Sequence, residues 1–172
     1  MDLASTVRSI PDFPVEGILF YDITTMLKNP LALKQCIDRL TDHYRDGNID
    51  VVVGMESRGF IFGMPVAYQL GAGFVPIRKP GKLPAETLAE SYELEYGSNA
   101  LEIHVDAIEA GQKVLVVDDL LATGGTARAT CNLVSRLGGQ IAGLAFVIEL
   151  NFLNGRDKLD DYEVFSLLKY DQ

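Results

Sequence analysis

The chain has few of the residues from which metal centres and disulfides are built. Its 172 residues include two cysteines, two histidines and no tryptophan, and none of them has the spacing of metal ligands. Cys36 and Cys131 fall within predicted helices, so we expect both thiols to pack as small apolar side chains. His43 and His104 lie far apart and are interpreted as structural or surface residues.

Basic residues and long apolar runs are also scarce. Lys and Arg number 15 against 24 Asp and Glu, a formal net charge of -9. This charge argues against non-specific binding to nucleic acid or to anionic membranes, although a local basic patch can still bind an anionic substrate. No apolar run approaches the roughly 18 residues of a membrane-spanning helix, and residues 1–5 lack signal-peptide character. We therefore expect a cytoplasmic enzyme with no nucleic-acid or membrane partner.

What the chain has is a regular alternation of short aliphatic runs and helical patterns. Strands are predicted at 50–54, 74–78, 100–105, 113–117, 141–148 and 162–168, and helices at 2–9, 30–46, 60–70 and 125–137. Residues 79–97 contain prolines, glycines and charges, and are expected to form a long mobile loop leading into a hairpin. The alternation predicts an α/β fold, a mostly parallel twisted sheet with helices on both faces. No linker is evident, so we expect one domain over 1–172.

The most informative stretch runs from Val114 to Thr126. An aliphatic strand is followed by Asp118 and Asp119, then by a small-residue loop, and then by a helix. Ligands bind at the carboxyl ends of the strands of such sheets, and a helix N-terminus attracts anions. The loop lacks the lysine of a P-loop and the three glycines of a dinucleotide site. We interpret it as a ribose-5-phosphate cradle, in which the carboxylates accept hydrogen bonds from sugar hydroxyls; the alternative is an ordinary turn with a threonine cap.

Four further parts of the chain could carry chemistry, each with a plainer alternative. Arg58, in a second strand-loop-helix unit, suits phosphate oxygens but could instead pair with a surface carboxylate. The basic segment 78–84 suits a lid over an anion or a solvated loop. Glu93 and Glu95 share one face of an alternating segment, where one could be a general acid or base, or both could be solvated. Phe20 could stack on a heterocycle or pack in the core.

Together these motifs resemble the adenine phosphoribosyltransferases, a family of type I phosphoribosyltransferases. The segment from Val116 to Thr126 resembles the superfamily's motif for 5-phosphoribosyl 1-pyrophosphate (PRPP). The resemblance to the adenine-specific family covers nearly the whole chain and is carried by four more segments, 11–24, 56–60, 77–84 and 91–97.

The resemblance implies conversion of adenine and PRPP to AMP and pyrophosphate in purine salvage, with Mg2+ held mainly through PRPP. It also implies a type I phosphoribosyltransferase fold with a small N-terminal hood and base-binding segment at about 1–28, a mobile lid hairpin at about 79–97, and a homodimer. By the same resemblance, Glu95 is the acid/base candidate, and Arg58 is catalytic through the leaving pyrophosphate. The remaining implied site residues bind PRPP (Asp118, Asp119, Ala122, Thr123, Gly124, Gly125, Thr126, Glu56, Ser57, Arg58, Arg78, Lys79, Lys82) or the base (Leu19, Phe20, Tyr21, Leu150).

Two other functions remain open at this point. One is a phosphoribosyltransferase for a different purine, such as guanine or xanthine. The other is a non-catalytic regulator that senses PRPP or a purine and binds nucleic acid, which the net charge disfavours.

Overall fold

The core of the protein is a five-stranded parallel sheet, seen in a computed structural model that describes residues 1–94 and 97–172. Its strand order is β4-β3-β7-β8-β9, and every neighbouring pair is parallel. The strands are β3 (Val51–Met55), β4 (Gly73–Ile77), β7 (Lys113–Leu121), β8 (Gln140–Leu150) and β9 (Val164–Tyr170). The predicted α/β architecture is confirmed, because each aliphatic run became a strand buried in the middle of a layered domain.

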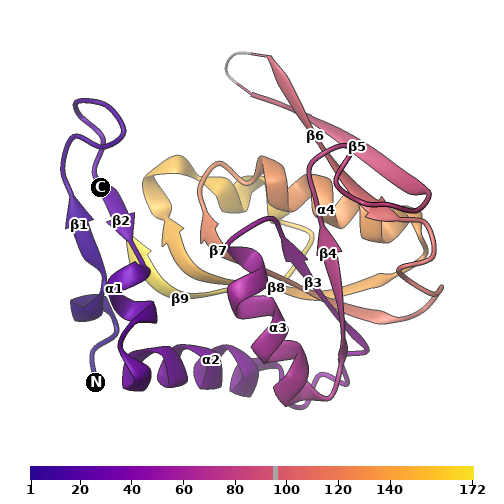
Figure 1. Ribbon diagram of the computed structural model, residues 1–172, viewed down its shortest axis with the longest axis horizontal. Coiled ribbons are helices and arrows are strands. Elements are labelled where there is room, and N and C mark those ends of the chain that lie inside the picture. Colours follow the sequence, from indigo (N-terminus) through magenta and orange to yellow (C-terminus); the bar gives the residue numbers. More distant parts are fainter. Residues whose placement is uncertain (95–96) are drawn as a thin grey trace.

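Helices cover both faces of this sheet (Figure 1). On one face α2 (Pro30–Tyr44) and α3 (Gly59–Leu70) pack on Val52 and its neighbours, and on the other α4 (Gly125–Arg136) packs with Val51 and Val53. Alternate residues of a strand point to opposite faces, so a run such as Val51 to Val53 must be apolar throughout. This explains why the central strands are continuous aliphatic runs.

The N-terminal segment forms a small structure of its own beside the sheet. It contains a 3-10 turn η1 (Ala4–Thr6), the antiparallel strands β1 (Arg8–Ile10) and β2 (Phe20–Asp22), and the short helix α1 (Thr24–Leu27). The helix predicted at 2–9 is therefore wrong. Pairing of β1 with β2 supplies backbone partners that a short isolated helix could not match. Figure 1 shows this hairpin standing next to β9, with the C-terminus close by.

The loop that begins at 79 leads into a hairpin, as expected, and the first strand of the hairpin begins at Thr87. Strand β5 (Thr87–Glu93) pairs antiparallel with β6 (Ser98–His104), and this hairpin rests on α4. Figure 1 shows the hairpin projecting beyond the sheet. In the chain the hairpin lies between β4 and β7, but in the sheet β7 pairs with β3. The Lys113 amide therefore donates to the side chain of Asp50, which is 63 positions earlier in the sequence.

Helix ends follow the local sequence. The Asn29 side chain accepts hydrogen bonds from the amides of Leu31 and Ala32, with Pro30 opening α2 as predicted. After β8 the chain makes two 3-10 turns, η2 (Asn151–Leu153) and η3 (Gly155–Leu159). Both cysteines are buried and free, as expected. Over 1–94 and 97–172, no helix combines the length and the apolar character that crossing a bilayer requires.

Candidate active site

The acidic pair lies near the carboxyl end of the central strand β7. The strand does not end before the pair, as the sequence suggested, but continues to Leu121, because Leu120 and Leu121 still pair with β8. Asp118 accepts a hydrogen bond from the amide of Asp119 at 2.9 Å. Burial, followed by the charge of Asp119, raises the pKa of Asp118 well above its usual value. Arg58 forms its ion pair with Asp119, and in the described part of the chain no ion pair is made by Asp118.

The loop after β7 forms a small polar cavity of about 80 Å3, which Asp118 and Ala122 to Thr126 help to line. Gly124 has φ +82° and precedes α4, which has no side-chain cap. The first amides of α4 thus lack the threonine hydroxyl partner that an ordinary capped turn would supply. Uncapped amides at a helix N-terminus attract anions. The capped-turn alternative is wrong, and the geometry suits a phosphate.

A larger cavity, of about 380 Å3, opens beside it. The four residues assigned to the base by resemblance, Leu19, Phe20, Tyr21 and Leu150, all line this cavity, together with Arg58 and Asp119. Phe20 is half-buried and contacts Phe13 edge to face, with ring centroids 5.1 Å apart. It therefore lines the cavity instead of packing in the core.

The Tyr21 side chain points away from this role. Its ring stacks on Tyr170 at 3.8 Å, and its hydroxyl donates to the carbonyl oxygen of Gln172 at 2.7 Å. Only its backbone is left to face the cavity, which suits recognition of a base edge by main-chain groups.

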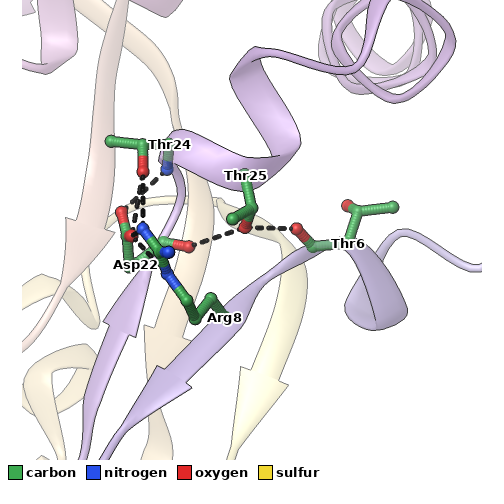
Figure 2. Close-up of polar contacts among 5 residues, drawn as sticks. All are labelled: Thr6, Arg8, Asp22, Thr24 and Thr25. Carbon is green, nitrogen blue, oxygen red and sulfur yellow. Dashed lines mark hydrogen bonds and ion pairs between the residues drawn. The ribbon is translucent and has the colours of Figure 1, made fainter.

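A polar network fixes the end of β2 (Figure 2). Asp22 accepts from Arg8 Nε at 3.0 Å, from the Thr24 amide at 2.9 Å and from the Thr24 hydroxyl at 2.8 Å. The Arg8 guanidinium is the main cause that lowers the pKa of Asp22 to about 2. Thr25 donates to the carbonyl of Thr6 at 2.7 Å, tying α1 to η1. Asp22 lines the base cavity but already has partners for both oxygens.

Arg58 forms an ion pair with Asp119. The alternative that it pairs with a surface carboxylate is wrong, because the Asp119 side chain is 9% exposed and belongs to the acidic pair. Arg58 precedes α3, which starts at Gly59, where a Cβ would lie 2.9 Å from Asp118 Oδ1. The absence of a side chain at Gly59 lets the second loop approach the first.

Of the remaining predicted residues, some are linked to Glu56 by hydrogen bonds and others are exposed in their loops. Glu56 accepts hydrogen bonds from Arg78 Nε at 3.2 Å and from the Lys79 amide at 2.9 Å, and chiefly that amide lowers its pKa. Lys79 lines a cavity between the hairpin strands, whereas Ser57 and Lys82 are exposed in their loops. None of these five residues lines either of the two cavities at the acidic pair. Glu95 lies outside the described residues.

Sequence reasoning missed the segment that supports the phosphate loop. Gly155 packs against the loop so closely that a Cβ on Gly124 would lie 2.4 Å from the Gly155 carbonyl oxygen. Asn154 and Gly155 form an Asn-Gly pair, which is a turn signal and could have drawn attention to this place. Its contact with the phosphate loop depends on the fold.

The two cavities, the acidic pair and the uncapped helix define a protein of the phosphoribosyltransferase class, and the sequence model of the phosphoribosyl transferase domain matches residues 22–171. An adenine phosphoribosyltransferase of Koribacter versatilis is 64% identical over 99% of this chain and 93% of its own. The chain therefore belongs to the adenine phosphoribosyltransferase family.

Solved structures agree with this assignment. The adenine phosphoribosyltransferase of Thermoanaerobacter pseudethanolicus superposes with a TM-score of 0.94 and 53% identity, covering 98% of both chains. That of Saccharomyces cerevisiae, in complex with an iminoaltritol bisphosphate and adenine, gives a TM-score of 0.93 and 46% identity over 97% of both chains. The predicted family and the predicted fold class are both confirmed.

Proposed function

We propose that this chain transfers the phosphoribosyl group of PRPP to adenine, giving AMP and pyrophosphate in purine salvage. The observation that carries this proposal is the continuity of the base cavity with the acidic pair, since Asp119 lines the same cavity as Phe20 and Leu150. A flat base in the cavity would lie beside a sugar held at the carboxylates, with its 5′-phosphate at the loop. Holding two reactants in this geometry supplies much of the rate of a transfer reaction.

The proposed roles follow the geometry. Asp118 and Asp119 accept hydrogen bonds from the ribose hydroxyls, while the amides of 122–126 hold the 5′-phosphate. Phe20 and Leu150 contact the ring, and the backbone at Leu19 and Tyr21 recognises its edge. An accepting carbonyl there would favour the 6-amino group of adenine and repel the 6-carbonyl of hypoxanthine or guanine.

The leaving group is proposed to lie beside the second loop. Arg58, with Glu56 and Ser57, would hold pyrophosphate, which requires the Arg58 guanidinium to exchange Asp119 for phosphate oxygens. Arg78, Lys79 and Lys82 would add positive charge at the approach to this place. Glu95 would face the base as general acid or base.

Mg2+ is the proposed cofactor, bound mainly through PRPP. Over 1–94 and 97–172, no cluster of three or more His, Cys, Asp or Glu side chains could hold a metal by itself. Two carboxylates next to a phosphate cavity fit the usual Mg2+ arrangement, in which substrate oxygens complete the coordination. When bound, the ion would neutralise charge on the departing pyrophosphate.

Residues 1–28 are proposed to form the hood and base-binding segment, and 79–97 the lid. Tyr92 supports the second assignment, because its ring lies 3.4 Å from where a Cβ of Gly125 would be, so the hairpin touches the phosphate loop. Limited proteolysis tests the lid: cleavage within 79–97 should slow with PRPP and Mg2+, and equal rates would contradict closure.

A homodimer is proposed on the exposed face of α3. Ile61, Met64 and Tyr68 lie on one side of this helix, with exposed fractions of 43%, 53% and 85%. A contiguous apolar face of this kind is typical of a surface buried by another chain. Tyr68→Glu should shift the sedimentation coefficient from that of a dimer to that of a monomer; an unchanged coefficient would contradict this placement.

Activity with a panel of bases tests the reaction. Purified protein should release pyrophosphate from PRPP with adenine in preference to hypoxanthine, guanine and xanthine. A preference for another purine would move the chain to that substrate, and absence of release with all four bases would favour a regulatory role.

A further inference from the structure

The segment after β8 meets the phosphate loop through two glycines. A Cβ on Gly124 would lie 2.4 Å from the Gly155 carbonyl oxygen, and a Cβ on Gly155 would lie 2.3 Å from that of Ala122. Real Cβ atoms do not approach other atoms so closely. The two backbones are therefore packed against each other with no room for a side chain. A displacement of Gly155 must displace the loop that holds Ala122 and Gly124.

The residue after Gly155 is anchored to the sheet. Arg156 Nε donates to Oε1 of Glu149 at 2.5 Å, Nη2 donates to Oε2 at 2.8 Å, and Nη1 donates to the carbonyl of Val164 at 2.9 Å. A two-point contact of guanidinium with carboxylate fixes orientation as well as distance. The three bonds together connect η3 to two strands.

Glu149 is a rigid anchor. Its side chain is 5% exposed, and its backbone pairs with β7 on one side and with β9 on the other. Burial opposes the charged form, but the hydrogen bonds from Arg156 offset it, so that the pKa of Glu149 stays below its usual value. Neither Glu149 nor Arg156 lines the base cavity or the phosphate cavity. Contact with a ligand in either of these two cavities therefore does not account for the pair.

We propose that Arg156 is a positioning residue for the 5′-phosphate site, acting through Gly155 and anchored by Glu149. The inference rests on the proposed function of the loop at 122–126. Amides at a helix N-terminus bind phosphate well only when their N–H groups point toward it. The contact of Gly155 with the loop, anchored by Arg156 and Glu149, fixes this orientation. The base side does not depend on it, because strand pairing with Tyr170 holds Leu150.

Calorimetric titration with two separate ligands tests the proposal. Arg156→Met should weaken binding of ribose 5-phosphate about tenfold, since small misplacements of binding groups are costly, and should leave adenine affinity within twofold, roughly the change that 0.4 kcal/mol produces. Arg156→Lys should fall between, because one ammonium can keep one carboxylate contact but not the fork. Arg45→Met is the control: Arg45 pairs with Asp42 on α2 and should change neither affinity.

Gly155→Ala tests the close approach itself. The added methyl must push against Ala122, so the KM for PRPP should rise more than kcat falls. Hydrogen exchange on the wild-type protein provides a test that needs no variant: ribose 5-phosphate should protect amides of 154–159 as well as those of 122–126. Circular dichroism and thermal unfolding of each variant show that it is folded.

The outcomes separate this inference from the proposed function. Loss of AMP formation by the wild-type protein would remove the function. An active wild-type protein with equal losses of adenine and ribose 5-phosphate affinity in Arg156→Met would overturn the inference alone. Folded Arg156→Met and Gly155→Ala proteins with unchanged ribose 5-phosphate affinity would do so too. If neither variant folds, absence of protection at 154–159 in the wild-type protein overturns it.

Discussion

The phosphate cavity and the base cavity lie side by side at the same end of the sheet and share Leu120, but they are built in different ways. The phosphate cavity is formed mostly by one continuous segment, 118–127, and its proposed binding groups are backbone amides. The base cavity gathers four separate parts of the chain: 13–24, the second loop with Arg58, Asp119 with Leu120, and Ile148 with Leu150. Its walls are mainly apolar side chains.

This difference separates what the sequence can reveal locally from what needs the fold. A phosphate site made from a glycine loop and a helix start has a short, contiguous pattern. A base site made from four separate segments has no such pattern. The two regions should also respond differently to substitution, the first to changes in charge and backbone, the second to loss of apolar surface.

The largest expected effect is on the sugar side. Asp118→Asn with Asp119→Asn should lower kcat/KM for PRPP more than a hundredfold, since charge-assisted hydrogen bonds are worth roughly 1.5–3 kcal/mol each. Steady-state kinetics measure this, and far-UV circular dichroism shows whether the fold persists. A folded double variant with near-normal activity would contradict the expectation that the phosphate and sugar side, unlike the base side, depends on charge.

A substitution in the base cavity should lower the affinity for adenine without changing the preference for adenine over other purines. Phe20→Ala should weaken adenine binding roughly five- to hundredfold, because stacking of a base on an aromatic ring is worth about 1–3 kcal/mol. The preference for adenine over hypoxanthine should stay, since backbone groups at Leu19 and Tyr21 make it. Phe152→Ala, at an exposed phenylalanine outside the cavity lining, is the control. An abolished preference with intact adenine affinity would reverse these two roles.

A smaller effect compares two arginines of similar setting. Arg8 and Arg156 are both partly exposed, and each contacts a buried carboxylate, Asp22 on the base side and Glu149 on the phosphate side. Arg8→Met should raise the KM for adenine about threefold and leave that for PRPP unchanged, since a partly exposed ion pair is worth about 0.2–1 kcal/mol. A rise in the KM for PRPP alone would show that the two regions are not supported separately.

The smallest expected effect is on the free energy of unfolding, and it is a gain, whereas the other substitutions cause losses of activity or affinity. Because the pKa of Asp118 is raised in the folded protein, its protonated form stabilises the fold below the unfolded pKa, and this contribution is lost as pH rises through the raised value. Asp118→Asn removes this half-buried, desolvated charge, so the variant should be more stable than the wild-type protein at neutral pH. Urea unfolding at several pH values measures the difference, which should vanish in acid. A less stable variant at neutral pH would contradict the buried-charge reading.

The sequence predicted the sheet and the phosphate loop because both depend on neighbours along the chain. The aliphatic runs, the Asn29–Pro30 helix start and the glycines at 124 and 125 all act locally. It failed at 2–9, where 4–6 form only a 3-10 turn and 8–10 pair with β2, whereas the hairpin expected near 79–97 is present as β5 and β6. The sequence did not reveal the support of the loop by Gly155 for the same reason, since Gly124 and Gly155, 31 positions apart, had to meet.

The pairing of β3 with β7 closes a long loop, and the entropy cost of closing it depends on how many residues lie between the two strands. It closes a loop in which Asp50 and Lys113, 63 positions apart, are joined, and β5 and β6 lie wholly inside that loop. The entropy lost on closure grows only with the logarithm of loop length, so ten extra residues there would cost about 0.1 kcal/mol. The sheet therefore tolerates hairpins of very different length between β4 and β7. Any change in the length of this segment must still keep Leu101 and Ile103 of β6 buried in the core and Tyr92 in contact with the phosphate loop.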